Sequence, residues 1–191
     1  MVFENDMRCM KDSRQTIQDL TLLNFGKERC CSSQQYGPFS RESSSIYIII
    51  SGKGLVTLDS HTYTLSAGDS FCIESGQMAL YQADAEDPWT YIWVDFCGFM
   101  TSFILLKANY SRFKPIVHLD STEKFEALVQ SLFQIKGHLF VDELERRGLF
   151  FDFIAQLIRN NKSRRGEEKD IFDTASYYAH ETYEPKFRPK L

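Results

Sequence analysis

The chain has 191 residues and a formal net charge of −4, and 43% of its residues are hydrophobic and 14% aromatic. These values are typical of a globular chain with an aromatic-rich core that has room for one well-buried domain and an appendage. The negative charge excludes tight DNA binding by this chain alone, because displacing counterions from phosphates requires a concentrated basic surface.

The sequence also argues against a membrane or secreted protein. No apolar run approaches the roughly 20 residues of a membrane-spanning helix, and residues 1–11 are charged and lack the apolar core of a signal peptide. The five cysteines include no CxxC pair, so neither a zinc site nor a disulfide framework is indicated. We therefore expect a cytoplasmic protein with reduced cysteines and no membrane partner.

The N-terminal part predicts an arm followed by the first strands. Residues 1–19 are polar with scattered apolar positions, which favours a flexible arm. Residues 20–26 read as a strand, and residues 27–41 as a further strand and a loop around Pro38.

The stretch from Ser45 to Gly98 contains short apolar, β-branched or aromatic runs at regular spacing. Turn residues such as Gly52-Lys53-Gly54 and Asp59-Ser60-His61 separate them. This pattern is typical of an antiparallel sandwich or barrel and not of a parallel βαβ sheet. The predicted strands are Ile46–Ile50, Leu55–Leu58, Thr62–Leu65, Ser70–Ile73, Met78–Gln82 and Trp89–Phe96.

The order of turns and aromatic residues in this stretch resembles a known family. The residues that carry the resemblance are Gly52-Lys53-Gly54, Tyr63-x-Leu65-x-x-Gly68-Asp69-x-Phe71-x-Ile73-x-x-Gly76, Tyr81-x-Ala83-Asp84 and Pro88-Trp89-x-Tyr91-x-Trp93-Val94-x-Phe96-x-Gly98, with Tyr36-Gly37-Pro38 and Arg41 upstream. Over about half of the chain they are similar to the cupin-type sensor domain of AraC/XylS-family transcription regulators, in the branch associated with sugar utilisation operons. The resemblance implies a mainly β, cupin-like (double-stranded β-helix or jelly-roll) barrel over residues 20–98, followed by two antiparallel helices.

After Gly98 the apolar period changes from that of strands to that of helices. A short helix is expected from Phe99, a second after the predicted cap at residues 120–123, and a long third helix from Val141 to Asn160. The long helix has more apolar residues than one contact with the barrel requires, so we expect residues 99–160 to form a homodimer. The predicted interface residues are Leu144, Phe150, Phe151, Ile154, Leu157 and Ile158.

Residues 161–169 are charged and read as a linker, and residues 170–191 begin with another helical pattern. In the family, the first helix of the DNA-binding domain begins at this point. The resemblance therefore implies that residues 170–191 start a helix-turn-helix domain whose recognition helices are absent from this chain. DNA would be bound only through that domain.

Catalytic chemistry finds no support in the sequence. The second metal-binding motif of cupins, laid on this chain from Gly68, puts Ala79 and Ala83 where His and Asn ligands belong, and all four histidines are isolated. We therefore expect no cofactor and no metal. A stand-alone cupin enzyme acting on a sugar or another small metabolite remains the alternative, and a dimerisation module without a ligand is a third.

The candidate ligand site consists of aromatic residues and one arginine. Trp89, Tyr91, Trp93 and Asp95 alternate along one strand and share one face. Aromatic faces cover the C–H surfaces of sugars, and the resemblance places Tyr81, Tyr91, Trp93 and Arg41 at or near sugar-contacting positions. The expected ligand-binding residues are thus Arg41, Tyr81, Tyr91, Trp93 and Trp89, with core packing as the alternative for the two tryptophans. In the related regulators the arm can fold over the ligand, which makes residues 1–19 a candidate lid; a terminus without a role is the alternative.

Overall fold

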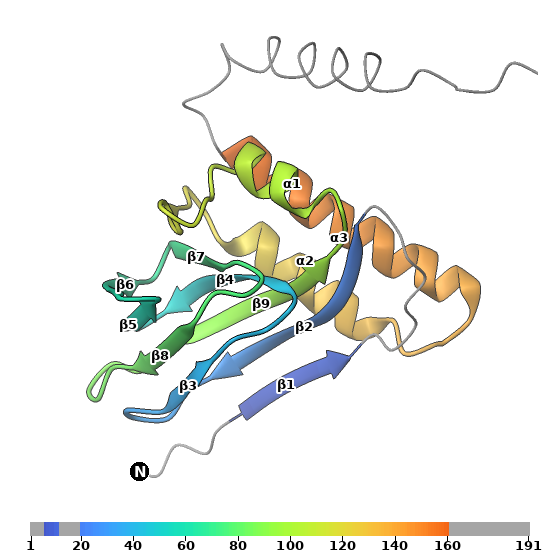
Figure 1. Cartoon of the computed structure of the whole chain (residues 1–191). Helices are drawn as coiled ribbons and strands as arrows, with labels where there is room; N and C mark the ends of the chain where they lie inside the picture. The colour runs from blue at the N-terminus through green and yellow to red at the C-terminus, as the bar shows by residue number, and fades with distance from the viewer. Residues whose placement is uncertain (1–5, 12–19, 161–191) are drawn as a thin grey trace, which may run out of the picture. The chain divides into compact units, whose positions relative to one another are not determined.

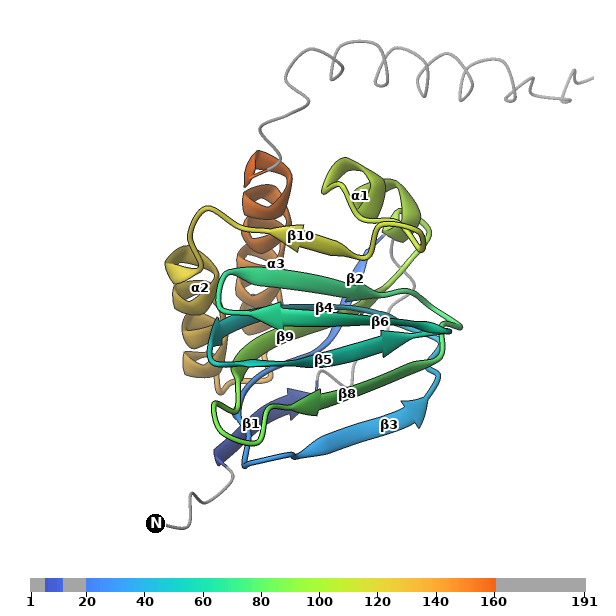
Figure 2. The same ribbon diagram turned by 90° about the vertical axis from the view of Figure 1, so that its left-hand side faces the viewer.

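Two antiparallel β-sheets face each other, and helices cover the outer face of one of them (Figures 1 and 2). The computed structural model of the chain describes residues 6–11 and 20–160. Within that part, the larger sheet has six strands in the order β1-β2-β9-β4-β7-β10, and the smaller one has four in the order β3-β8-β5-β6. The expected cupin-like fold, mainly β with helices after it, is confirmed.

The strand bounds follow the predicted runs closely. The larger sheet consists of β1 (Asp6–Lys11), β2 (Thr21–Arg29), β9 (Thr90–Cys97), β4 (Ser44–Ser51), β7 (Asp69–Ile73) and β10 (Ile116–His118). The smaller sheet consists of β3 (Gln35–Phe39), β8 (Ala79–Ala83), β5 (Lys53–Leu58) and β6 (His61–Ser66).

The central strands of the larger sheet are apolar on both faces because both faces are buried. In β9, Tyr91 and Trp93 point into the space between the two sheets, whereas Ile92 and Val94 point toward the helices. A strand that alternates between two cores reads as a nearly continuous apolar run. This explains why β4 and β9 are the strongest strand signals in the sequence.

Two strands add to the sheet beyond the predicted barrel. Residues 6–11, expected to belong to a flexible arm, form β1 and pair with β2, with Lys11 opposite Asn24 and Asp6 opposite Arg29. β10 lies within the region expected to be helical and pairs antiparallel with β7. Both pairings join segments that local sequence patterns do not connect.

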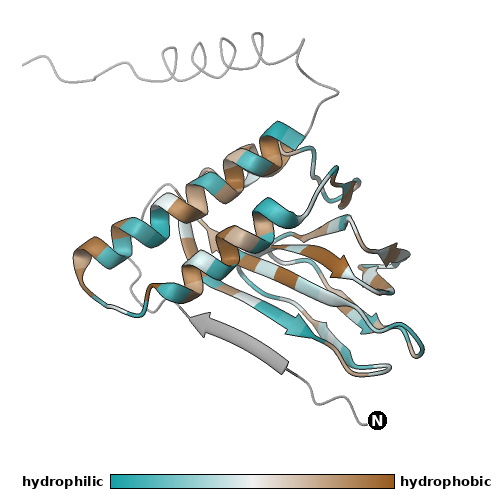
Figure 3. Ribbon diagram, turned by 180° about the vertical axis from the view of Figure 1, so that it is seen from behind, coloured by the Kyte–Doolittle hydropathy of each residue, from teal (hydrophilic) through white to brown (hydrophobic). Residues whose placement is uncertain are grey.

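Three helices follow the first nine strands: α1 (Thr101–Lys107), α2 (Glu123–Gln134) and α3 (Phe140–Asn160). The predicted cap of α2 is in place at Thr122, but its side chain makes no capping hydrogen bond. Lys27 on β2 forms an ion pair with Glu126 on α2, which ties this helix to the sheet. Figure 3 shows α2 and α3 lying across the outer face of the larger sheet.

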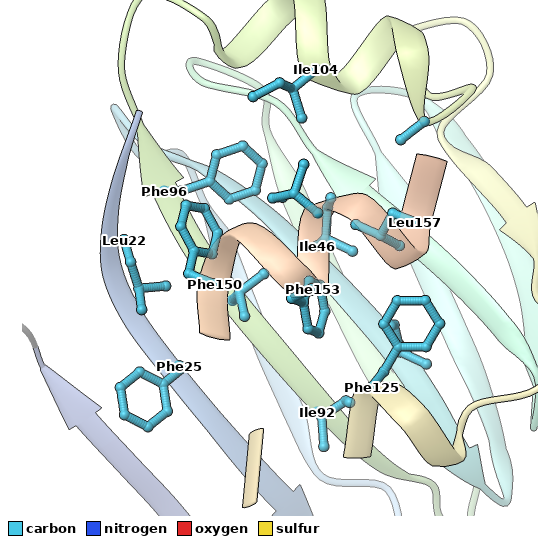
Figure 4. Close-up of a cluster of buried hydrophobic side chains, with 14 of the residues drawn as sticks. Leu22, Phe25, Ile46, Ile92, Phe96, Ile104, Phe125, Phe150, Phe153 and Leu157 are labelled. Atoms are coloured by element: carbon cyan, nitrogen blue, oxygen red, sulfur yellow. The ribbon is translucent and has the colours of Figure 1, made fainter. Parts of the chain in front are cut away.

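The structure shows that several apolar residues of α3 expected at a contact between chains are instead buried within one chain. Phe150, Phe153, Ile154 and Leu157 are at most 4% exposed and pack on the sheet and on α2 (Figure 4). Phe150 contacts Phe96 of β9, with 5.7 Å between the ring centroids. Phe150, Ile154 and Leu157 therefore belong to the core of one chain, and they are not available for the contact between chains that the sequence suggested.

The opposite face of α3 remains apolar. Val141, Leu144 and Phe151 are about half exposed, and Gly148, Ala155 and Ile158 continue their line along the helix. We call these six residues the outer stripe. Their spacing of three and four residues is that of a seam between two helices.

No helix in the part of the chain that the structure describes is long and apolar enough to cross a membrane. The linker and the start of a helix-turn-helix domain, expected at residues 161–191, lie outside the described residues, as does most of the predicted arm.

Candidate functional site

A cavity of about 320 Å³ opens between the two sheets beside β2. Strands β2, β3, β4, β8 and β9 and the loop before β4 all contribute to its wall. The lining residues are Asn24, Glu28, Tyr36, Arg41, Ser43, Tyr47, Tyr81, Tyr91, Trp93 and Asp95. Five of these ten residues are aromatic.

The aromatic wall is held by ring contacts between neighbouring strands. Tyr47 and Trp93 are opposite each other on β4 and β9, and their rings are nearly parallel with centroids 6.4 Å apart. Tyr91 meets Trp93 edge to face at 5.8 Å, and Tyr81 meets Tyr91 in the same way at 6.0 Å. Such contacts fix the ring planes, so the cavity has a rigid apolar surface.

Trp93 depends on a glycine for its position. Gly26 on β2 is its cross-strand partner, and a Cβ atom at Gly26 would lie only 2.2 Å from the indole ring. The indole therefore lies directly on the glycine backbone. An alanine at position 26 would push the ring toward the cavity, so this glycine shapes the site.

A buried carboxylate forms the polar part of the wall on β2. Glu28 is 1% exposed and accepts hydrogen bonds from the hydroxyl of Tyr36 at 2.5 Å, from Gln34 Nε2 at 2.7 Å and from the hydroxyl of Tyr91 at 2.6 Å. Burial, together with the neighbouring Glu28 carboxylate, raises the pKa of both tyrosines. Their hydroxyls therefore stay protonated and serve as donors.

A second carboxylate, Asp95, lies near the loop that precedes β4. Its Oδ2 accepts from Asn24 Nδ2 at 3.2 Å and from Arg41 Nη1 at 3.4 Å, and the guanidinium of Arg41 also lies 4.6 Å from the centre of the Phe39 ring. Burial raises the pKa of Asp95, while hydrogen bonds and the Arg41 charge act in the opposite direction. Arg41 is half exposed and comes from the loop, and its charge is partly offset by the buried Asp95 carboxylate.

The structure brings together four of the five residues expected to bind a ligand. Arg41, Tyr81, Tyr91 and Trp93 all line the cavity. Trp89 does not: it is fully buried and rests on Gly54, where a Cβ atom would lie 2.5 Å from its ring. Trp89 is a core residue of the space between the sheets, which corrects its assignment to the site.

Sequence reasoning missed the polar half of the site. Asn24, Gly26 and Glu28 alternate along β2 and face the cavity, although the strand was expected to end at Gly26. The sequence signal that could have found them is the polar side chains of Asn24 and Glu28 on one face of a buried strand. Tyr47 was hidden within an apolar run and was interpreted only as core.

A larger hollow of about 720 Å³ lies at the ends of β2, β4 and β9, next to α2. Its wall mixes charges of both signs, including Lys27, Arg29, Glu86 and Asp87, and Phe133 is its single aromatic ring. Lys27 is already paired with Glu126. The smaller cavity has the more specific chemistry.

Among the described residues, no three His, Cys, Asp or Glu side chains converge in a way that could hold a metal ion. Cys30, Cys31, Cys72 and Cys97 form no disulfide bond, and burial raises the pKa of Cys30 to about 12. What the cavity offers is aromatic surface, two carboxylates, one guanidinium and neutral hydrogen-bonding groups.

Comparisons with known proteins agree with this arrangement. A family model described as AraC-like ligand binding domain matches residues 25–154. The chain is 32% identical to the Msm operon regulatory protein of Streptococcus mutans over an alignment of 143 residues. This alignment covers 73% of this chain and 51% of that protein. The chain is 28% identical to the raffinose operon transcriptional regulatory protein RafR of Pediococcus pentosaceus over 172 residues. That alignment covers 85% of this chain and 61% of the relative.

The chain thus spans about half the length of the curated relatives it matches, or somewhat more. Among solved structures, a cupin superfamily protein from Desulfitobacterium hafniense is similar over 49% of this chain and 80% of that one, with 11% identity and a TM-score of 0.38.

Proposed function

Because the chain belongs to the family of AraC-like ligand-binding domains, we propose that it is the effector-binding and dimerisation part of a cytoplasmic transcription regulator and that its effector is a sugar. The effector site is the cavity between the two sheets. One of the curated relatives is the regulator of a raffinose operon, which supports the choice of a sugar. We propose no catalytic activity; stoichiometric iron, manganese or zinc in the purified chain would favour the enzyme alternative.

The observation that carries the proposal is the combination of an aromatic wall with buried hydrogen-bonding groups. Sugar rings present C–H surfaces that pack on aromatic faces and hydroxyls that need precisely placed polar partners. Trp93, Tyr47 and Tyr81 supply the first, and Glu28 and Asp95 supply the second. A cavity of about 320 Å³ has room for one sugar ring with part of a second or with water.

A thermal-shift screen against monosaccharides and oligosaccharides, with α-galactosides first, tests this function. A ligand that binds only the folded state raises the melting temperature, by an amount that corresponds to about 2.7 kcal/mol at a concentration 100 times its Kd. We expect at least one sugar to raise Tm in a concentration-dependent way. A flat response across the panel would contradict the sugar assignment.

We propose that the ligand acts by shifting a population of conformations. β1 pairs along β2, and β2 carries Asn24 and Glu28 of the cavity wall. A ligand that binds these side chains would stabilise β2 and hence the pairing with the arm. DNA contact would belong to a helix-turn-helix domain that residues 170–191 begin.

We further propose that two chains pair through the outer stripe of α3. The stripe is apolar and regularly spaced. Val141, Leu144 and Phe151 are about half exposed in one chain, Ala155 and Ile158 are partly buried, and Gly148 has open space around it, where another backbone can approach. Identical subunits most often meet across a twofold axis, which lets the same surface contact itself. Leu144, Phe151 and Ile158 are the predicted interface residues that remain compatible with the structure.

Replacing Leu144 and Phe151 together with glutamate should convert the dimer into a monomer. Each charge would be buried against apolar residues and near its own copy, which is strongly unfavourable. Sedimentation velocity at a chain concentration of tens of micromolar measures the oligomeric state. The control variant carries Gln130→Glu and Gln156→Glu, which add the same charge on α2 and α3 outside the stripe and should leave the dimer intact. A monomeric wild type, or a dimeric Leu144→Glu/Phe151→Glu variant, would place the interface elsewhere.

A further inference from the structure

The charged groups of the cavity wall are mostly negative. Two lining residues are carboxylates, Glu28 and Asp95, and both side chains are nearly fully buried. Arg41 is the single basic residue among the described residues that line the cavity, and it is half exposed and already in contact with Asp95. Apart from Arg41, the wall therefore presents acceptors and tyrosine hydroxyls and no cationic side chain from the described residues.

Asp95 is incompletely satisfied by the protein. Its Oδ2 makes two long contacts, at 3.2 and 3.4 Å. The Ser45 side chain is a further hydrogen-bonding neighbour of this carboxylate, but Oδ1 has no partner of good hydrogen-bond geometry among the described residues. Burial of this carboxylate raises its pKa. A buried carboxylate oxygen without a well-placed partner is costly, so Oδ1 of Asp95 favours a ligand that donates a hydrogen bond to it.

Glu28 makes the β2 side of the cavity unfavourable for a second negative charge. Burial is the main cause that raises the pKa values of the neighbouring Tyr36 and Tyr91, and the Glu28 carboxylate acts in the same direction. Any anionic ligand group at the same distance would meet the same repulsion in a poorly solvated space. A neutral hydroxyl group meets none, and it can donate to a carboxylate or to a tyrosine oxygen.

From these contacts we propose that the cavity selects its effector by charge: it accepts an uncharged, hydroxyl-rich sugar and rejects the phosphorylated or acidic form of the same sugar. Asp95 and Glu28 are the residues that impose this choice. The inference rests on the proposed function, since it names the chemical class of ligand for the same site. A regulator with this selectivity responds to the sugar before a phosphoryl-transfer or oxidation reaction consumes it.

Matched ligands test the proposal with the unmodified chain. Two series share ring and stereochemistry and differ only at carbon 6: D-galactose, D-galacturonate and D-galactose 6-phosphate, and the corresponding D-glucose compounds. Isothermal titration calorimetry gives the affinity of each. We expect the neutral member of the better-bound series to bind at least about 100-fold more tightly than both anions, a difference of about 2.7 kcal/mol.

Two variants separate charge from size. Glu28→Gln and Asp95→Asn remove one negative charge each and keep the shape of the side chain. If charge causes the selection, the preference for galactose over galacturonate should fall at least about tenfold in one or both variants. Glu145→Gln, an exposed position on α3, is the matched control and should leave the preference unchanged.

The possible results distinguish the two proposals. If an anionic sugar binds as tightly as the neutral one, the charge inference is wrong and the sugar-sensing function stands. A preference for the neutral sugar that both variants retain in full would show that size, and not charge, sets it, and would also overturn the inference. If no sugar of either series binds and the broader sugar screen is also flat, the sugar-sensing function fails and the charge inference fails with it.

Discussion

Phe150→Ala should lower the free energy of unfolding by about 3–5 kcal/mol, because it leaves a cavity between α3 and the sheet. The ring is 1% exposed and packs on Phe96 of β9. For a chain of this size, such a loss corresponds to a decrease in Tm of about 6–20 °C. Thermal and urea denaturation of the variant measure it directly.

The neighbouring residue supplies the matched control. Phe151 is 51% exposed and lies in the outer stripe. Phe151→Ala removes the same ring, but within one chain it should change the stability by about 0.5 kcal/mol or less, as is usual for surface positions. The comparison is made at chain concentrations low enough to keep both variants monomeric. Equal losses for the two variants would mean that α3 is rotated relative to the structure.

Trp93→Ala should abolish effector binding. The indole lines the cavity and is held flat on Gly26, so its removal takes away the main apolar surface for a ligand. The structure also changes the expected cost of this substitution. Trp93 is 7% exposed and packs on Tyr47 and Tyr91, so we expect the variant to lose several kcal/mol of stability, within the range of about 3–5 kcal/mol seen for large core residues.

Trp89→Ala separates the loss of stability from the loss of a ligand contact. Trp89 is fully buried and does not line the cavity, so its removal should destabilise the chain by a similar amount. We expect this variant to bind the effector within about tenfold of wild type at a temperature where both variants are folded, a difference of at most about 1.4 kcal/mol. If calorimetry finds equal losses of binding in the two variants, Trp93 acts through the core and not as a ligand contact.

Most of the strands could be predicted from the sequence because their signals are local. The run Ile46–Ile50 and the alternation from Trp89 to Phe96 are too short for independent helices and are flanked by turn residues, and both are strands in the structure. The helix from Val141 to Asn160 was expected within one residue of its observed start. The shared face of Trp89, Tyr91 and Trp93 also follows from the period of a strand alone, and all three point between the sheets.

Other features depend on contacts between distant segments. Helical spacing shows that α3 has apolar residues on two faces, but which face meets the sheet depends on how the helix lies on β9 and α2. For this reason the sequence placed Phe150 in the contact between two chains, whereas in the structure it packs on β9 within one chain.

Trp89, just before β9, and Trp93, within β9, show the same limit. Trp93 meets Gly26 of β2 at the wall of the cavity, whereas Trp89 meets Gly54 of β5 in the packed interior. The sequence by itself determined most of the strands, the long helices and the aromatic face of the site. Only the tertiary structure decided which aromatic rings line the cavity and which carboxylates stand beside them, because Glu28 and Asp95 come from segments 67 residues apart that meet only when β2 pairs with β9.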